Sequence, residues 1–208
     1  MAATAKRKDG EKPAYHHGDL RAALMTAALE LIDRHGVKAF SLKDAAVMAG
    51  VSTAAPYRHF ADKEALLRAI QMEGFSQFNA ALAAAYESGQ TPQARIEELG
   101  VAYVMFALEH PGHFRVMFGM TGSGSPESEA SDAPEPTGFL LLVKGVEELM
   151  PRASEQDRHA MVLAAWSLVH GFAMLQMEGA LTGLVPAGEI EAQLRRTLAL
   201  SIGPTAGA

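Results

Sequence analysis

The sequence has no cysteine among its 208 residues. This absence excludes a disulfide framework and any metal site built from thiolates. It also fits a reducing compartment. Because the first residues lack the apolar stretch of a secretory signal peptide, we expect a cytoplasmic protein.

The short motifs of common catalytic and cofactor sites are also missing. There is no nucleophile elbow, no HExxH zinc pair, no phosphate-binding loop and no paired ExxH sequence. His110 and His113 come nearest to a metal pair, but Pro111 and Gly112 interrupt the helix between them. We therefore expect a protein that is not an enzyme and that needs no metal or cofactor.

No apolar run is long and clean enough to predict a membrane span. The longest, residues 160–177, is interrupted by Ser167, His170 and Gln176 and has no basic flanks. Apolar residues still make up 49% of the chain, which is enough for a substantial core. We expect one or two helical domains and no membrane partner.

Positive charge is scarce overall and lies mainly at one end. The net charge is −6, yet residues 1–68 hold 11 Lys and Arg against 8 Asp and Glu. The remaining residues hold 7 against 16. A basic end on an acidic body suits a protein that meets DNA with one end only.

The most informative stretch is residues 41–63, SLKDAAVMAGVSTAAPYRHFADK. Ser41 predicts a helix N-cap, Asp44 gives a shortened capping box, and the apolar residues that follow have helical spacing. Gly50 ends this helix, because glycine adopts the left-handed C-cap conformation without steric cost. A second short helix after the glycine turn would complete a helix-turn-helix unit, whose second helix can enter the DNA major groove.

That second helix, predicted over residues 53–59, carries hydroxyl, guanidinium and imidazole groups beside small residues that allow close approach to bases. Ser52 caps it, and Phe60 anchors its end to the domain. Asp62 caps the following helix and places Lys63 in its first turn, where it can reach a phosphate.

The run AGVSTAAPYRHFADKEALL, preceded by a helix that ends in DRHG, resembles the DNA-binding domain of the TetR family of transcriptional regulators. The likeness covers the first third of the chain, and Pro56 departs from it, because the family usually has leucine there. The resemblance implies a homodimer that binds double-stranded DNA at a near-palindromic operator. Resemblance and geometry together assign eight residues to the DNA face: Lys43, Thr53, Ala54, Ala55, Tyr57, Arg58, His59 and Lys63.

Periodic apolar residues and capping signals predict helices along most of the chain. Their expected ranges are 19–36, 62–87, 91–110, 139–150, 154–177 and 189–202, with a short helix around residues 114–118. Asp19, Thr91 and Ser154 are the expected N-caps of three of them. The helix over residues 91–110 has apolar residues on both sides, so we expect neighbours to surround it. The polar, basic composition of residues 1–14 predicts a disordered arm. Residues 121–138 are rich in Gly, Ser, Pro and acidic residues, which predicts a mobile loop. The expected fold is all-α: a three-helix helix-turn-helix head (15–62) on a helical bundle (63–208) for ligand binding and dimerisation.

The last predicted helix is amphipathic, with Ile190, Leu194, Leu198 and Ile202 at regular spacing. Such a helix needs a packing partner. The family resemblance implies that the last two long helices form the dimer.

Trp166, His170 and Gly171 stand together on the longest apolar helix, with the first two one turn apart on one face. This spacing resembles the signature of a TetR subgroup named for its Trp-His-Gly residues. Small-molecule sites are mostly apolar with a few placed polar groups. The candidate ligand-binding residues are Tyr103, Phe106, His110, Phe114, Met117, Phe118, Phe139, Trp166, His170 and Met174. The alternative is that these residues fill a closed core.

The resemblance therefore implies a transcriptional regulator, most often a repressor, that a small apolar or aromatic effector releases from its operator. The effector would stabilise a conformation of the body in which the spacing between the two heads of the dimer no longer fits DNA. One alternative is an architectural DNA-binding protein without a ligand, although a large aromatic and methionine-rich body argues against it. Another is a regulator that acts as an activator.

Overall fold

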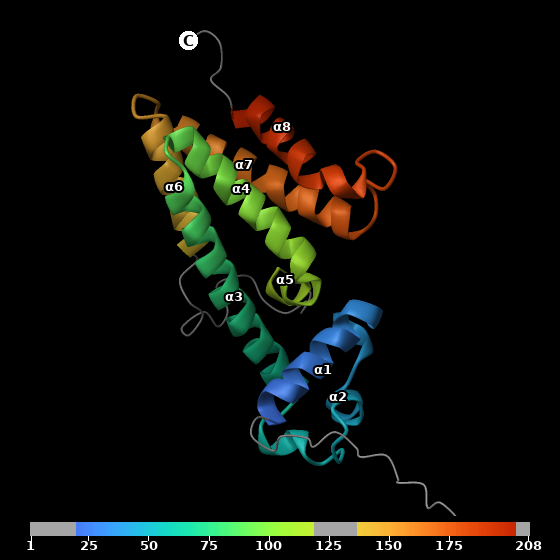
Figure 1. Cartoon of the computed structure of the whole chain (residues 1–208). Coiled ribbons are helices and arrows are strands. Elements are labelled where there is room, and N and C mark those ends of the chain that lie inside the picture. Colours follow the sequence, from blue (N-terminus) through green and yellow to red (C-terminus); the bar gives the residue numbers. More distant parts are fainter. Residues whose placement is uncertain (1–19, 119–136, 203–208) are drawn as a thin grey trace, which may run out of the picture.

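The computed structural model describes residues 20–118 and 137–202 and contains only helices within them (Figure 1). They are α1 (Leu20–His35), the 3-10 helix η1 (Val37–Ala39), α2 (Leu42–Met48), η2 (Pro56–Arg58), α3 (Lys63–Ser88), α4 (Pro92–Glu109), α5 (Pro111–Met117), α6 (Thr137–Leu149), α7 (Glu155–Met177), η3 (Ala187–Glu189) and α8 (Ile190–Ile202). The predicted all-α fold, a helix-turn-helix head on a helical body, is confirmed.

The head consists of α1, η1, α2, η2 and the first turns of α3, around a core of its own. The predicted capping box is present: the Ser41 amide donates to the Asp44 carboxylate at 2.8 Å, and the Asp44 amide donates to the Ser41 hydroxyl at 3.3 Å. Gly50 has the predicted positive φ, 71°. Phe40 and Phe60 are both buried and hold the ends of this unit against the core.

The expected α-helix over residues 53–59 is wrong in type and length. The structure has a single 3-10 turn, Pro56–Arg58, and its N-cap is Ala55 rather than Ser52. An α-helix would need an amide hydrogen at residue 56 to reach the Ser52 carbonyl. Proline has none, and its ring crowds that carbonyl. The Ala55 amide donates to the Ser52 carbonyl instead, at 2.9 Å.

Helix α3 runs from the head into the body, as Figure 1 shows. Asp62 caps it as predicted, accepting from the Ala65 amide at 2.7 Å. Its first turns contribute Leu66, Leu67 and Ile70 to the head core. Its later turns contribute to the body core, so one rigid helix joins the two parts.

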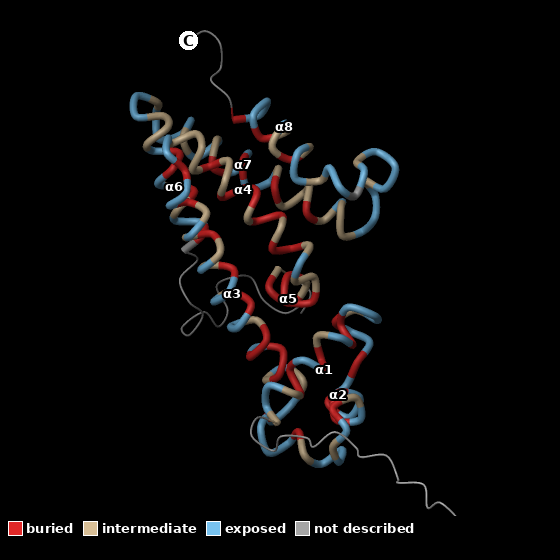
Figure 2. Tube along the Cα trace, in the orientation of Figure 1, coloured by how far each residue is buried: buried red, intermediate tan, exposed pale blue. Residues whose placement is uncertain are grey.

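The body is arranged around α4, which contacts α3, α5, α6, α7 and α8. Thr91 caps α4 as predicted, accepting from the Ala94 amide at 3.1 Å. Buried residues follow the inner sides of α3 and α4 in Figure 2. Because neighbours enclose α4 on so many sides, the predicted surrounded helix is confirmed.

Helix α8 finds its partner within its own chain. Leu194, Leu198 and Ile202 are buried in the body core. A Cβ atom on Gly100 would lie 3.0 Å from Leu198 Cδ1, so α8 packs closely on α4. Arg195 reinforces this packing with two hydrogen bonds to the Glu98 carboxylate, at 2.7 and 3.0 Å. The apolar stripe of α8 therefore needs no second chain to cover it.

Three predicted features fall wholly or partly outside the described residues. They are the arm at residues 1–14, the capping of α1 by Asp19, and most of the loop at 121–138. The end of that loop is corrected, because Thr137 and Gly138 already belong to α6. The predicted domain boundary at 62/63 stays a prediction.

Candidate DNA interface and candidate effector site

The predicted DNA face centres on the turn that contains η2. Thr53, Ala54, Tyr57, Arg58 and His59 are all exposed, and the Tyr57 side chain is 52% exposed. Ala55 is half-buried, while Pro56 and Phe60 point inward. The segment therefore presents hydroxyl, guanidinium and imidazole groups on a surface that two buried apolar residues anchor.

Lys43 lies on the exposed side of α2, one helical turn before Val47. Val47 is 69% exposed, which is unusual for a branched apolar side chain beside a core. Sequence reasoning did not single out Val47, although the helical spacing of the buried Leu42, Ala45 and Ala46 already places it on the outer side. The two side chains extend the exposed surface from η2 onto α2.

Lys63 has a different environment from the other seven predicted contacts. Its Nζ donates to the Lys38 carbonyl at 3.4 Å and lies 4.4 Å from the centroid of the Phe40 ring. Arg21, which the sequence did not indicate, lies over the Phe60 ring at 5.4 Å. Both cations therefore help to hold the head together at the places where its helices begin.

In the body, the predicted ligand-binding aromatics form one packed cluster. The ring of Phe78 stands edge-to-face against Tyr103 and Phe106, both at 5.1 Å between centroids. Phe114, which is fully buried, lies 5.7 Å from the Tyr103 ring and 4.7 Å from the Phe118 ring. These distances are those of favourable aromatic pairs. The structure brings together residues from α3, α4 and α5.

One polar pair lies inside this cluster: the Tyr103 hydroxyl is 2.8 Å from His170 Nδ1. Burial raises the pKa of the Tyr103 hydroxyl well above its usual range, against a smaller opposing effect of the Trp166 indole. Burial also lowers the pKa of His170. Both groups are therefore neutral at pH 7. They share one hydrogen bond, and its direction depends on which imidazole nitrogen carries the proton.

The remaining candidates divide between the cluster and its edges. His110 stacks on Phe106 at 4.7 Å, and Met117 is buried in the same core. Met174 packs on that core from α7. Phe139 and Trp166 pair with each other at 5.6 Å, with side chains 36% and 39% exposed. Trp166 also lies beside the Tyr103 hydroxyl, so this pair borders the cluster.

Comparisons with known proteins agree with this division into head and body. A family model for bacterial regulatory proteins of the tetR family matches residues 24–70. A model for the tetracyclin repressor-like C-terminal domain matches residues 96–200, which is half of the chain.

The chain belongs to the TetR family.

Regulators are among its relatives. An uncharacterised HTH-type transcriptional regulator of Mycobacterium tuberculosis is 26% identical over 162 residues, covering 76% of this chain and 71% of that protein. A protein of unknown function from Rhodococcus sp. RHA1 is 32% identical with a TM-score of 0.66, covering 90% of this chain and 97% of that one. A tetR-family regulatory protein from Rhodococcus RHA1 reaches a TM-score of 0.70 at 23% identity, with the same coverage. This TetR-family chain is accordingly a DNA-binding transcriptional regulator, in a family of regulators rather than enzymes.

In this TetR-family protein, the short helix α5 lies between the end of α4 and helix α1 of the head (Figure 1). Arg115 on α5 pairs with Asp33 on α1 at 3.2 Å. A Cβ atom on Gly112 would lie 3.0 Å from Leu29 and 3.2 Å from the Asp33 carboxylate. These contacts join residues 82 positions apart in sequence, so no local pattern could have indicated them.

Tyrosines aside, His113 on α5 is the one polar or charged residue that is buried in the described ranges. Its Nε2 atom has no hydrogen-bond partner and lies 4.0 Å from the Glu73 carboxylate on α3. Burial lowers the pKa of His113; Glu73 opposes this shift, His110 adds to it and Asp33 opposes it. The rings of His110 and His113, which the sequence did not favour as a metal pair, lie 6.0 Å apart between centroids. In the described ranges, no group of three potential metal ligands surrounds them.

A shallow hollow of about 280 Å³ opens beside the Asp33–Arg115 pair. Its other lining residues are Leu108, Pro111 and Met177. This volume is just below the range usual for small-molecule sites. The hollow lies apart from the Tyr103–His170 pair and shares no lining residue with the predicted ligand set.

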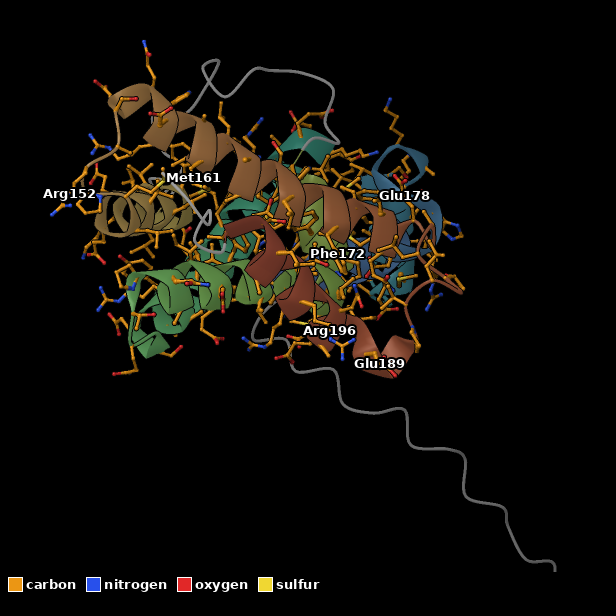
Figure 3. All side chains as sticks on the ribbon, turned by 90° about the horizontal axis from the view of Figure 1, so that it is seen from above. Arg152, Met161, Phe172, Glu178, Glu189 and Arg196 are labelled. Atoms are coloured by element: carbon orange, nitrogen blue, oxygen red, sulfur yellow. The ribbon has the colours of Figure 1, made fainter. Side chains whose placement is uncertain are left out.

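Helix α7 presents an apolar outer face. It is the one helix in the described ranges that is long and apolar enough to cross a membrane by length and composition, and 22% of that window is buried. Leu163 and Leu175 are 43% and 46% exposed, and a Cβ atom on Gly171 would meet nothing within 4 Å. Figure 3 shows α7 running across the end of the body past Met161, Phe172 and Glu178. Exposed apolar side chains grouped on one helix face are typical of an interaction surface.

Proposed function

We propose that this protein is a homodimeric repressor in the cytoplasm that binds a near-palindromic operator and that a small apolar or aromatic effector releases. The eight residues predicted for the DNA face make the contacts. The cluster around Tyr103 and His170 receives the effector. Helices α7 and α8 supply the dimer surface.

The observation that carries the DNA-binding part is the surface at η2. Five side chains between residues 53 and 59 are exposed, and the buried Pro56 and Phe60 anchor this segment to the core. A rigid polar surface beside basic residues is suited to contacts with base edges and phosphates. The 3-10 turn keeps this surface short, which limits the number of bases that one head can read.

The dimer part rests on the outer face of α7. Leu163, Leu175 and the open side of Gly171 leave apolar area that the chain itself does not cover. On a helix, these positions can pack against the same positions of a second copy in a symmetric interface. A two-fold dimer matches two half-sites of opposite direction, which is the basis for expecting a near-palindromic operator.

The effector part rests on the connection through α5. Phe114 on α5 contacts the Tyr103 and His170 rings, both at 5.7 Å between centroids. One residue later, Arg115 pairs with Asp33 of the head. A ligand that shifts the Phe114 ring would move the helix that holds α1. Such a shift changes the spacing of two heads in a dimer and lowers operator affinity.

Selection of binding sites from random DNA with the purified protein tests the DNA-binding part. We expect an inverted repeat. We also expect Thr53→Ala and Tyr57→Phe to change which bases are preferred, with about 1–3 kcal/mol of discrimination for a lost base contact. Equal weakening on all DNA sequences would contradict the base-reading assignment for Thr53.

A promoter assay distinguishes the regulatory alternatives. With the selected operator placed across a promoter, we expect the protein to reduce transcription, and a screen of aromatic and apolar metabolites to find one that restores it. Increased transcription would support an activator. Binding that leaves transcription unchanged and responds to no metabolite would support the architectural alternative.

A further inference from the structure

Phe118 follows the last residue of α5 and occupies an unusual position in the aromatic cluster. Its ring centroid lies 4.7 Å from Phe114, 5.4 Å from the His170 imidazole, and 5.9 Å from each of Phe75, Phe78 and Tyr103. These five rings come from α3, α4, α5 and α7. A ring surrounded in this way sits in an aromatic cage.

The Phe118 ring itself is held less firmly than the rings around it. Phe114 is fully buried within α5, whereas Phe118 is half-buried and is the C-cap residue. Its backbone donates one hydrogen bond, from its amide to the Phe114 carbonyl at 3.1 Å. A rotation of its side chain would empty the cage without breaking a bond inside the helix.

We propose that the Phe118 ring is an internal plug, and that the cage it fills takes the ring of a neutral monocyclic aromatic effector with one hydrogen-bonding substituent. This inference rests on the proposed effector response and specifies its ligand. In the ligand-free protein, Phe118 takes the place of the effector ring. The effector competes with it for the same five neighbours.

The shape and polarity of the cage select this class of ligand. Edge-to-face contacts around a single ring fit another single ring, because favourable aromatic pairs have centroids about 4.5–7 Å apart. The hydrogen-bonded Tyr103–His170 pair adjoins the ring position. A small polar substituent on that ring can therefore bond with the pair. A carboxylate would lose its hydration next to neutral groups, which is strongly unfavourable.

Calorimetric titration of the full-length Phe118→Ala protein with phenol tests the proposal. We expect one phenol bound per chain, with affinity at least about tenfold tighter than for the wild type, because the plug is gone. Toluene, which lacks the hydroxyl, should bind more weakly than phenol, and benzoate should not bind. Trp166, the single tryptophan, lies beside Tyr103 and gives a second readout by fluorescence.

Phe172→Ala is the matched control. Phe172 is also a half-buried phenylalanine packed on the body core, and in the described ranges no ring contact joins it to the cage. This variant should bind phenol no better than the wild type does. Equal gains in the two variants, or no gain in folded Phe118→Ala, would overturn the proposal. If Phe118→Ala does not fold, Phe118→Leu replaces it, with a smaller gain expected and the same overturning result.

Operator binding is measured separately, so that the two proposals can fail separately. If phenol enters the cage and operator affinity does not change, the cage is correct and the effector response is wrong. If operator binding is normal and phenol does not enter the opened cage, the plug is wrong and the DNA-binding role stands.

Discussion

Single cations connect elements of this protein through rings and carbonyl groups. Lys63 joins the start of α3 to η1 through the Lys38 carbonyl and the face of Phe40. Lys144 lies over the Tyr86 ring at 5.6 Å at the opposite end of the molecule. The same kind of contact therefore occurs both near the predicted DNA face and far from it. This allows the DNA contribution of Lys63 to be separated from its structural contribution.

We predict that Lys63→Ala lowers the free energy of unfolding by about 0.5–1 kcal/mol, the usual value of an exposed cation–ring contact. It should also weaken binding to all DNA sequences alike, because a phosphate contact carries no sequence information. Lys144→Ala should cost similar stability with unchanged DNA affinity. Thermal melting and DNA titration measure both. Loss of sequence preference in Lys63→Ala would contradict the phosphate role.

At the scale of elements, close approaches decide how helices meet. Between α3 and α4, a Cβ atom on Gly89 would lie 2.5 Å from the Arg95 amide nitrogen and 2.6 Å from its Cα atom. Backbone atoms inside a helix cannot move aside as a flexible side chain can. The turn between α3 and α4 therefore depends on this glycine.

We predict that Gly89→Ala destabilises the protein by about 1–3 kcal/mol, the usual cost of forcing extra atoms into a packed site. Gly171→Ala is the matched control, because a Cβ atom there meets nothing in its own chain. Alanine in mid-helix should leave stability unchanged or raise it by up to about 1 kcal/mol. Urea titrations of both variants test this. Equal stability of the Gly89→Ala variant and the wild type would contradict the geometry.

Helix α5 makes stability depend on pH through His113. Burial lowers its pKa in the folded protein from the ordinary value of 6.5, against opposing effects of Glu73 and Asp33 and with a further lowering by His110. Arg115, on the same helix, pairs with Asp33 nearby. As pH falls through about 6.5, the unfolded chain binds a proton that folded His113 does not. Stability therefore falls with pH in this window.

We predict that His113→Gln reduces the slope of unfolding free energy against pH between about pH 7.5 and 5.5. The slope should not vanish, because burial also lowers the pKa of His170. Denaturant titrations across the window measure it. His159→Gln, which removes an exposed histidine on α7, is the control and should retain the wild-type slope. An unchanged slope in His113→Gln would show that His113 titrates alike in both states.

At the scale of the whole molecule, the two faces of the last helices have different roles. The inner face of α8, with Leu194 and Leu198, is buried against α4. The outer face of α7, with Leu163 and Leu175, is left open by the single chain. A charge introduced on the inner face of α8 should therefore destabilise the folded chain. A charge introduced on the outer face of α7 should instead disrupt dimerisation.

We predict that Leu175→Glu gives a folded monomer with lost operator affinity, because a charge in an apolar interface is not compensated. Leu198→Glu should fail to fold. Sedimentation together with circular dichroism distinguishes these outcomes. Leu140→Glu, at a residue of α6 that is 52% exposed, should remain a dimer. A fully dimeric Leu175→Glu protein would contradict the proposed interface.

The sequence by itself determined the helices and their starts, because caps act over three residues. Ser41, Asp62, Thr91 and Ser154 all cap the helices that they were predicted to cap. The sequence also contained the signal that the second helix of the motif shortens to a 3-10 turn. Proline has no amide hydrogen, so Pro56 cannot make the α-helical hydrogen bond at its position.

Only the tertiary structure decided which faces meet. Periodicity identified the apolar stripe of α8 but could not tell whether α4 or a second chain covers it, because both would bury the same residues. Tyr103 and His170 are 67 positions apart, and Arg115 and Asp33 are 82 apart. Such pairs form when packed helices bring distant segments together, and no pattern within either segment encodes its partner. The connection from the aromatic cluster to the head therefore belongs to the fold.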